Sequence, residues 1–275
     1  MFRKVTIIGV GLIGGSLALA IKKRKIGSQV WGFFRRKNAL KLAEKNKIVD
    51  KGTQDLYQAV AGSDFVILAT PVNSIISIAS QLKDILSYDT LITDVGSSKT
   101  KIVSVLQKLF PRYVGSHPLA GSEKKGFVNA TENLFKDKIT IVTPTPRSDK
   151  KAVSKIKKFW TDLGSNVVIM SPQLHDRVLS QISHLPHIAV FGLLNSVNDK
   201  YLKYATTGFK DTTRIGASHP DLWLEIFETN KSNLLIDLNR YITWLRKYQQ
   251  ALQGNNYNRL LKYIQQASEK RKTLE

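Results

Sequence analysis

The sequence predicts an α/β domain built on a doubly wound parallel sheet, followed by an all-α helical domain. A chain of 275 residues is long for one compact domain, and chains of this length commonly divide into two. Short apolar runs rich in Val, Ile and Thr alternate with segments of helical spacing over the first 170 residues, whereas only helical spacing follows. We therefore expect an α/β domain over residues 1–170 and a helical domain over residues 171–275.

Seven apolar runs are the candidate strands of the first domain. The segments between most of them repeat apolar residues at helical spacing, as in Ile75, Ile76, Ala79, Leu82 and Ile85. Alternation of strand and helix is typical of a parallel sheet that helices cover on both faces. The candidate strands are Val5–Ile8, Gln29–Phe33, Phe65–Ala69, Leu91–Val95, Tyr113–Gly115, Ile139–Thr143 and Val167–Met170.

The second domain has a helical pattern throughout. Ser171 followed by Pro172 is a typical helix start, and apolar-periodic segments cover Leu174–Asn195, Pro220–Ala251 and Asn256–Ala267. Their large apolar side chains exceed what one helix face needs against a single partner. This favours a homodimer through the helical domain, with an intramolecular bundle as the alternative. These side chains include Leu222, Trp223, Ile226, Phe227, Leu234, Leu235, Leu238, Ile242 and Leu245.

The composition is that of a globular protein with a strongly basic surface. Lys and Arg number 42 against 21 Asp and Glu, which gives a net charge of +21. Such a charge attracts polyanions and steers small anionic substrates and phosphorylated cofactors. The basic residues are spread along the chain, at Lys22–Lys25, Lys150–Lys158 and Lys270–Lys272, without a nucleic-acid-binding motif beside them. This favours a solvated basic surface over a nucleic-acid partner.

The sequence contains neither a long apolar run nor a cysteine, and each absence excludes a class of location or chemistry. No uncharged apolar run approaches the ~20 residues that span a bilayer, and the N-terminus runs directly into a candidate strand rather than a signal sequence. We expect a cytoplasmic protein without a membrane partner. The chain has no cysteine, so disulfides, thiolate catalysis and thiolate metal ligands are excluded together.

A glycine motif follows the first candidate strand. Gly9, Gly11 and Gly14 form G-x-G-x-x-G between that strand and a helical pattern. The glycines suit a tight turn, close approach of a pyrophosphate and close packing of helix on strand, while the helix N-terminus faces the phosphate charge. The motif predicts a Rossmann-type dinucleotide site, with Leu12 and Ile13 among the cofactor contacts.

Two arginines stand where an NAD-binding site commonly has an acid. About 20 residues after the last glycine, an Asp or Glu would accept hydrogen bonds from the ribose hydroxyls. Here the residue is Phe34, followed by Arg35 and Arg36. Guanidinium groups pair with a 2′-phosphate that a carboxylate would repel. The sequence therefore predicts NADP, with NAD possible, and the alternative is that both arginines belong to the general basic surface.

Further candidates follow later strands, at the sheet edge where ligands of such folds bind. Thr70 and Pro71 follow the third candidate strand, and Ser97 follows the fourth, which places Ser97 near the nicotinamide. His117 lies in a loop between glycines and a proline, in GSHPLAG. Taking a hydride from a carbinol requires removal of the hydroxyl proton, and neutral imidazole is the usual base near pH 7. We expect His117 to be that base rather than a structural histidine.

The helical domain carries other polar candidates. His184 and His187 in SHLPH lie three residues apart on one helix face. A metal would need further ligands, for which Asp176 and Glu123 are the candidates, so no metal site is predicted, and core or ligand contacts are favoured. The arginine of GFKDTTRIG, Arg214, could pair with Asp211 or bind a substrate carboxylate. His175 and His219 are expected near helix starts, without a chemical role.

These motifs together resemble those of the prephenate/arogenate dehydrogenase family of tyrosine biosynthesis. The glycine motif, DVGSSK, GSHPLAGSE, SHLPH and GFKDTTRIG occur in that order across nearly the whole chain. The resemblance implies a Rossmann domain with a helical dimerisation domain. It also implies the oxidative decarboxylation of prephenate to 4-hydroxyphenylpyruvate, or of arogenate to tyrosine, with NAD or NADP. The length leaves no room for an additional mutase or regulatory domain, which indicates the monofunctional form.

The resemblance also implies roles for individual residues. His117 resembles the catalytic histidine that hydrogen-bonds the ring hydroxyl, and Ser97 the serine that orients that hydroxyl. Arg214 resembles the arginine that binds a substrate carboxylate. His187 and Glu123 match polar residues lining the same pocket, and Asp211 and Trp223 match residues near its entrance.

Two departures from the commonest family pattern bear on specificity. The missing ribose-binding acid is typical of members that use NADP. The second histidine of SHLPH is present, which favours prephenate over arogenate. A β-hydroxyacid dehydrogenase shares this domain plan, but it would carry a catalytic lysine in the first helix after the junction, and Leu174–Asn195 contains none. An NAD(P)-sensing nucleic-acid-binding module is the alternative from another class, and it would not require Ser97, His117 and Arg214.

Overall fold

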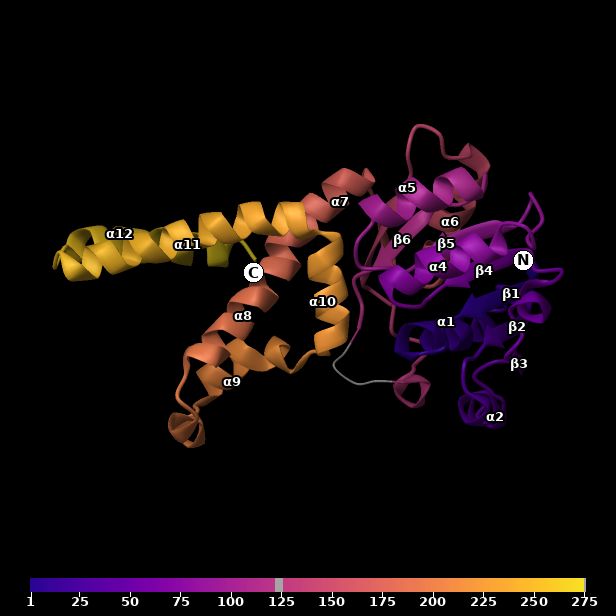
Figure 1. The fold of residues 1–275 in the computed structure, drawn as a ribbon, viewed down its shortest axis with the longest axis horizontal. Coiled ribbons are helices and arrows are strands. Elements are labelled where there is room, and N and C mark those ends of the chain that lie inside the picture. Colours follow the sequence, from indigo (N-terminus) through magenta and orange to yellow (C-terminus); the bar gives the residue numbers. More distant parts are fainter. Residues whose placement is uncertain (122–125, 275) are drawn as a thin grey trace.

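The computed structural model describes residues 1–121 and 126–274. Its N-terminal part is a sheet covered by helices, and its C-terminal part is a set of helices that projects away from the sheet (Figure 1). A helical hairpin at the far end is formed by α11 and α12.

Five parallel strands form the main sheet, in the order β3-β2-β1-β4-β5. β1 lies in the middle, with β2 and β3 added on one side and β4 and β5 on the other, which is the doubly wound arrangement. Four of these strands match predicted runs, and β3 was not predicted because its sequence, KGT, has no apolar run. The strands are β1 (Phe2–Ile8), β2 (Gly27–Phe33), β3 (Lys51–Thr53), β4 (Phe65–Leu68) and β5 (Leu91–Asp94).

A second, three-stranded sheet follows, and it corrects the expectation of one parallel sheet. It contains β6 (Gly115–Pro118), β7 (Ile139–Thr143) and β8 (Asn166–Ile169), and β6 runs antiparallel to β7. In the described part of the β6–β7 connection the helical element is a short 3₁₀ turn, Phe127–Asn129, instead of a crossover helix. Parallel pairing needs such a crossover. Tyr113, predicted to begin a strand, makes an isolated bridge with Ile92 of β5 that joins the two sheets.

Helices cover both faces of the main sheet, as predicted. Leu17 of α1 and Phe159 of α6 belong to the apolar core on one face, whereas Ile75 of α4 and Ile102 of α5 belong to the core on the other. Burial of each such side chain contributes about 1.5–3 kcal/mol. These helices are α1 (Leu12–Lys23), α2 (Lys37–Lys45), α3 (Leu56–Val60), α4 (Val72–Leu82), α5 (Thr100–Leu109) and α6 (Lys150–Asp162).

The first helix of the helical part, α7, begins at Pro172. Ser171 caps the first helix by accepting a 3.1 Å hydrogen bond from the backbone N–H of Leu174, and Pro172 occupies the first turn. The predicted helix over 174–195 contains a π turn at Ser180–His184, and the predicted helix over 220–251 breaks at Asn230. The helices are α7 (Pro172–Leu179), α8 (Leu185–Ser196), α9 (Thr207–Thr213), α10 (Pro220–Thr229), α11 (Lys231–Gln253) and α12 (Tyr257–Lys272).

Within residues 1–121 and 126–274, no helix combines the length and apolar character that crossing a membrane requires.

Candidate active site

The glycine turn between β1 and α1 has three different surroundings. Gly9 has φ +98°, and a Cβ there would lie 2.6 Å from the carbonyl oxygen of Ala69. A Cβ on Gly14 would lie 2.2 Å from the carbonyl oxygen of Gly9, so helix and turn pack too closely for a side chain. At Gly11 an added Cβ would meet no described atom within 4 Å. The turn is therefore closed on two sides and open at Gly11.

The start of α1 provides hydrogen-bond donors toward this open side. α1 begins at Leu12, and Gly11 at its N-cap has no side chain to satisfy the first N–H groups. The backbone N–H groups of Leu12 and Ile13 therefore lack intrahelical partners, and they attract an anion. The donor set fits the pyrophosphate of a dinucleotide, which would supply a nicotinamide ring as hydride acceptor.

Thr70 and Pro71 lie next to the same turn. The methyl group of Thr70 approaches the Cβ position of Gly9, and Pro71 stands at the N-terminus of α4. The Thr70 hydroxyl is buried and has no hydrogen-bond partner among the described residues. A buried hydroxyl normally has a partner, so this one fits a contact that a bound cofactor would complete.

Arg35 and Arg36 follow β2 and are exposed. Within the described ranges, neither guanidinium forms a hydrogen bond or an ion pair. Phe34, at the position of the expected acid, is buried between Gly32 and Gly52 with its ring edge-on to Phe127. A core phenylalanine thus replaces the carboxylate, and two exposed guanidinium groups stand beside it.

His117 lies on β6 and belongs to a chain of three buried side chains. Its Nδ1 atom is 2.8 Å from Nε2 of His175, and Nδ1 of His175 is 2.8 Å from a carboxylate oxygen of Asp176. Asp176 also accepts hydrogen bonds from the backbone N–H groups of Lys99, at 2.7 Å, and Thr100, at 2.8 Å. His117 comes from the sheet part, and its partners come from α7 of the helical part.

A buried ion pair lies beside this chain. Lys99 forms a salt bridge with Asp94 and donates a 2.8 Å hydrogen bond to the carbonyl oxygen of Ser116. Tyr113 donates a 2.7 Å hydrogen bond to the other carboxylate oxygen of Asp94. Burial lowers the pKa of Lys99, while Asp94 acts in the opposite direction. Ser97 lies half-buried in the loop between this pair's residues.

These surroundings keep His117 neutral. Burial lowers its pKa well below the usual value, and the neighbouring Lys99 and the ionisable rings of His175 and His184 act in the same direction. An unprotonated imidazole at neutral pH can accept a proton, which is the property a general base needs.

The helical part supplies a second group of polar residues. The His187 ring stacks on Trp223 with centroids 3.4 Å apart, and its Nδ1 atom donates a 2.8 Å hydrogen bond to the carbonyl oxygen of Ser183. Burial lowers the pKa of His187, and the positive charge of Arg214 lowers it further. The His184 ring lies edge-on to the same Trp223, with centroids 6.1 Å apart.

Comparison with known protein families assigns the chain to one of them. Residues 17–169 match the nucleotide-binding domain of prephenate dehydrogenase, and residues 171–266 match its dimerization domain. The chain belongs to the prephenate dehydrogenase family. As in that family, it is an NAD(P)-dependent oxidoreductase.

Curated relatives and solved structures show the same family. Bacillus subtilis prephenate dehydrogenase is 34% identical over 277 residues, covering 97% of this chain and 75% of its own length. Zymomonas mobilis cyclohexadienyl dehydrogenase is 32% identical, covering 100% of this chain and 97% of its own. The Aquifex aeolicus prephenate dehydrogenase complex with hydroxyphenyl propionate and NAD+ superposes with a TM-score of 0.94 at 34% identity, covering 100% and 99% of the two chains. Synechocystis arogenate dehydrogenase superposes at 0.85 with 28% identity, covering 99% and 100%.

The structure gives two residues of the candidate site a place that the sequence did not suggest. His175 was expected to have no chemical role, but it contacts His117 directly. Asp176, considered above as a metal ligand, holds His175 and the start of α5 instead. The signal in the sequence was an adjacent His-Asp pair in the first helix after the junction. No sequence rule states that this pair reaches a histidine 58 positions earlier.

Other predicted residues have the following positions. Arg214 forms no ion pair with Asp211 or any other carboxylate of the described residues, and Glu123 lies outside them. His184 is buried and accepts a 3.0 Å hydrogen bond from Asn230, whereas His187 is half-buried, so the two do not share one environment. No group of three potential metal ligands occurs among residues 1–121 and 126–274. His219 stands at the start of α10, as expected.

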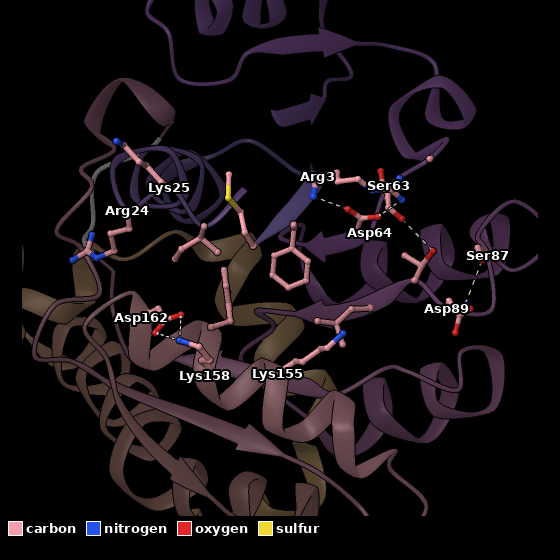
Figure 2. Close-up of a pocket in the computed structure, with 17 residues that line it drawn as sticks. Arg3, Arg24, Lys25, Ser63, Asp64, Ser87, Asp89, Lys155, Lys158 and Asp162 are labelled. Carbon is pink, nitrogen blue, oxygen red and sulfur yellow. Dashed lines mark hydrogen bonds and ion pairs between the residues drawn. The ribbon is translucent and has the colours of Figure 1, made fainter. Parts of the chain in front are cut away.

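A cavity of about 860 Å³ at the opposite edge of the sheet is separate from this site (Figure 2). It lies where β1, β4 and β5 begin and where α6 passes. Four of its charged side chains pair with one another, Arg3 with Asp64 at 2.9 Å and Lys158 with Asp162 at 2.8 Å. None of the predicted catalytic or cofactor residues lines it, so the active-site proposal does not depend on this cavity.

Proposed function

We propose that the protein is a prephenate dehydrogenase that prefers NADP and converts prephenate to 4-hydroxyphenylpyruvate by oxidative decarboxylation. The observation that carries the proposal is the neutral, buried imidazole of His117 at the junction of the two parts. Its strand, β6, belongs to the sheet part, and its Nδ1 atom contacts His175 of the helical part at 2.8 Å.

The proposed chemistry begins with proton transfer to His117. Its imidazole accepts the proton of the C4 hydroxyl as the C4–H bond breaks and its electron pair leaves as hydride. The bond between C1 and the ring carboxylate then breaks, CO₂ leaves, and the electron pair makes the ring aromatic. The same imidazole returns the proton to the phenolate oxygen, so His117 ends the cycle neutral. Because aromatisation drives the reaction, the protein mainly supplies position and charge.

The helical part would hold the substrate. Arg214 is an exposed guanidinium without an ion pair among the described residues, and its planar donors suit a carboxylate. His187 is fixed by Trp223 and Ser183, so its Nε2 atom is left to accept a hydrogen bond. Ser97 lies in the loop after β5 and would orient the reacting hydroxyl. Glu123 remains a predicted pocket residue.

The NADP preference rests on the edge of β2. Phe34 leaves no carboxylate to bind ribose hydroxyls, and Arg35 and Arg36 present exposed positive charges there. A 2′-phosphate carries the charge that these guanidinium groups attract. The A. aeolicus relative was solved with NAD+.

A two-by-two assay tests the reaction. Prephenate and arogenate are each supplied with NAD and with NADP, and reduced nicotinamide is followed by absorbance. We expect the highest kcat/KM for prephenate with NADP. Turnover of arogenate alone would make the protein an arogenate dehydrogenase, and comparable turnover of both substrates would make it a cyclohexadienyl dehydrogenase.

We further propose that the protein is a homodimer through its helical part. Large apolar side chains are exposed on α11 and α12, including Leu235 at 48%, Leu245 at 49%, Leu252 at 55% and Ile264 at 52%. Exposed apolar surface of this extent is typical of an interface. Light scattering should give twice the 30.9 kDa of one chain. A monomer mass at micromolar concentration would contradict the proposal.

A further inference from the structure

We propose that His175 and Asp176 are positioning residues that fix the tautomer of His117, leaving its Nε2 atom as the proton acceptor. The proposal rests on the proposed role of His117 as base. It extends that role to two side chains of the helical part, for which the sequence suggested no function in the reaction.

The hydrogen-bond chain has only one consistent direction. An ionised carboxylate can only accept, so Nδ1 of His175 must donate to Asp176 across 2.8 Å. In a neutral imidazole the other nitrogen then carries the lone pair, so Nε2 of His175 accepts. The 2.8 Å contact with His117 therefore requires Nδ1 of His117 to be the donor. The remaining nitrogen of His117, Nε2, is left unprotonated.

Asp176 is itself held from several directions. Its two carboxylate oxygens accept from the backbone N–H groups of Lys99 and Thr100, which begin α5. Its backbone carbonyl accepts a 2.7 Å hydrogen bond from the side chain of Asn230. Although burial alone would raise the pKa of Asp176, the hydrogen bonds from His175 and from the start of α5 lower it. The carboxylate therefore stays ionised, as the chain requires.

The direction of the chain also requires a neutral His175. A protonated His175 would donate from both nitrogens and would force Nδ1 of His117 to accept, which would place the proton of His117 on Nε2. Burial lowers the pKa of His175, and Lys99 lowers it further, while Asp176 and Asp94 act in the opposite direction. Burial is the largest of these effects, so the neutral form is favoured.

The arrangement explains how a buried imidazole can become charged during the reaction. When Nε2 of His117 takes the substrate proton, the ring becomes a cation in a site that disfavours charge. Its Nδ1–H then donates to His175, which is oriented by the ionised Asp176. No proton needs to leave His117 for His175, and the proton on Nε2 returns to the product oxygen.

The tautomer can be measured in the unmodified protein. The chain has five histidines, so ¹⁵N-labelled histidine gives at most ten ring-nitrogen signals per chain, which single-histidine variants assign. We expect the unprotonated nitrogen of His117 to be Nε2 at pH 7.5, and the same for His175. A proton on Nε2 of His117 would overturn the proposal without any need for a variant at the site.

Two variants of His175 test the kinetic consequence. His175→Leu removes the acceptor, and we expect kcat to fall by roughly 10- to 100-fold, the usual effect of losing a residue that orients a reactive ligand. KM for both substrates should stay within about threefold, because His175 is fully buried and is argued to act only through His117. His175→Gln can present an amide oxygen to His117 and should recover most of kcat. The matched control is His219→Leu, at the start of α10, which should leave kcat unchanged.

The results separate this proposal from the role of His117. If His117→Asn is inactive while His175→Leu is fully active, the role of His117 as base is supported and the positioning role of His175 and Asp176 is contradicted. If both variants are fully active, the role of His117 as base is excluded as well. If His175→Leu and His175→Gln lose kcat equally while both bind NADP normally, a hydrogen-bond acceptor for Nδ1–H of His117 makes no difference to kcat, and the proposal fails.

Discussion

At the scale of single residues, the proposed chemistry depends on the groups that surround His117. Exposed histidines titrate near neutral pH, and they are partly protonated when a base is needed. Burial, with His175, Lys99 and His184 as neighbours, lowers the pKa of His117 and so avoids this partial protonation. The same burial also destabilises the cation that His117 becomes when it takes the substrate proton. The hydrogen bond to His175 would stabilise that cation.

Replacement of His117 by Asn should depress turnover selectively. The amide cannot accept a proton, and loss of a general base commonly lowers kcat by about 10²- to 10⁴-fold. The dissociation constant for NADP should stay within about twofold, because the variant leaves the backbone donors at the start of α1 unchanged. Steady-state kinetics and fluorescence titration with NADPH measure both quantities. A His117→Asn enzyme whose kcat stays within a few fold of the parent value would exclude the base.

Replacement of Arg35 and Arg36 by Ala should affect NADP and not NAD. A hydrogen bond to a charged group contributes about 1.5–3 kcal/mol, so NADP binding should weaken at least tenfold while NAD binding changes little. Isothermal titration with each cofactor gives the ratio. Lys41→Ala, another exposed cation on α2, is the control for general loss of positive charge. An unchanged NADP/NAD ratio in the double variant would assign both arginines to the general basic surface.

At the scale of elements, the turn from β1 into α1 separates a packing role from a binding role. Gly14 stands against the backbone of Gly9, so any side chain there must push the helix from the strand. Gly11 faces open space and stands where a phosphate would approach. The same residue type therefore serves stability at one position and ligand access at the other.

This difference predicts opposite outcomes for two alanine variants. Gly14→Ala should lower the melting temperature by several degrees, because overpacking costs about 1–3 kcal/mol. Gly11→Ala should leave the melting temperature of the free protein nearly unchanged and weaken cofactor binding at least tenfold. Thermal unfolding and cofactor titration of both variants make the comparison. Equal melting temperatures for the two variants would contradict the close packing at Gly14.

Elements also show how far local sequence could predict this fold. Apolar runs located β1, β2, β4, β5 and β7, because a buried strand needs them. β3 lacks such a run and exists because β2 offers an edge to pair with. The antiparallel direction of β6 could not be read from alternation, since direction depends on the path of the connection. The π turn at Ser180–His184 and the break at Asn230 interrupt helices whose apolar spacing continues through them.

At the scale of the whole molecule, the two parts are joined through polar groups of the candidate site. Asp176 of α7 caps α5, and Ser98 donates a 2.9 Å hydrogen bond to Thr229 of α10. The hydrogen bond from His117 to His175 crosses the same junction. A change in the relative position of the two parts would therefore change the surroundings of His117.

The buried histidines make the stability of the molecule depend on pH. The folded-state pKa values of His117, His175 and His187 are lowered, and burial lowers that of His184 to about 4. Below the unfolded value of about 6.5, the unfolded chain binds protons that the folded chain does not. The stability that these residues contribute is therefore complete above about pH 7 and is lost as pH falls toward the folded values.

Unfolding by urea should show this loss directly. Between pH 7 and pH 5 we expect the free energy of unfolding to fall, by up to roughly 1 kcal/mol per pH unit for each buried histidine. Protein concentration is held constant because dimerisation would also contribute to stability. His219→Gln, at the start of α10, is the control for replacement of a histidine outside this buried group. Stability that is flat from pH 7 to pH 5 would show that these histidines are not held neutral.

The sequence by itself determined the order of the elements, the glycine turn, the helical character of the second part and the residues worth testing. These follow from local rules, since apolar spacing, glycine conformation and capping act over a few positions. Only the tertiary structure decided which distant side chains meet, and so revealed His175 and Asp176 beside His117. It also decided the charge state of those groups, because burial depends on what the whole chain packs around them.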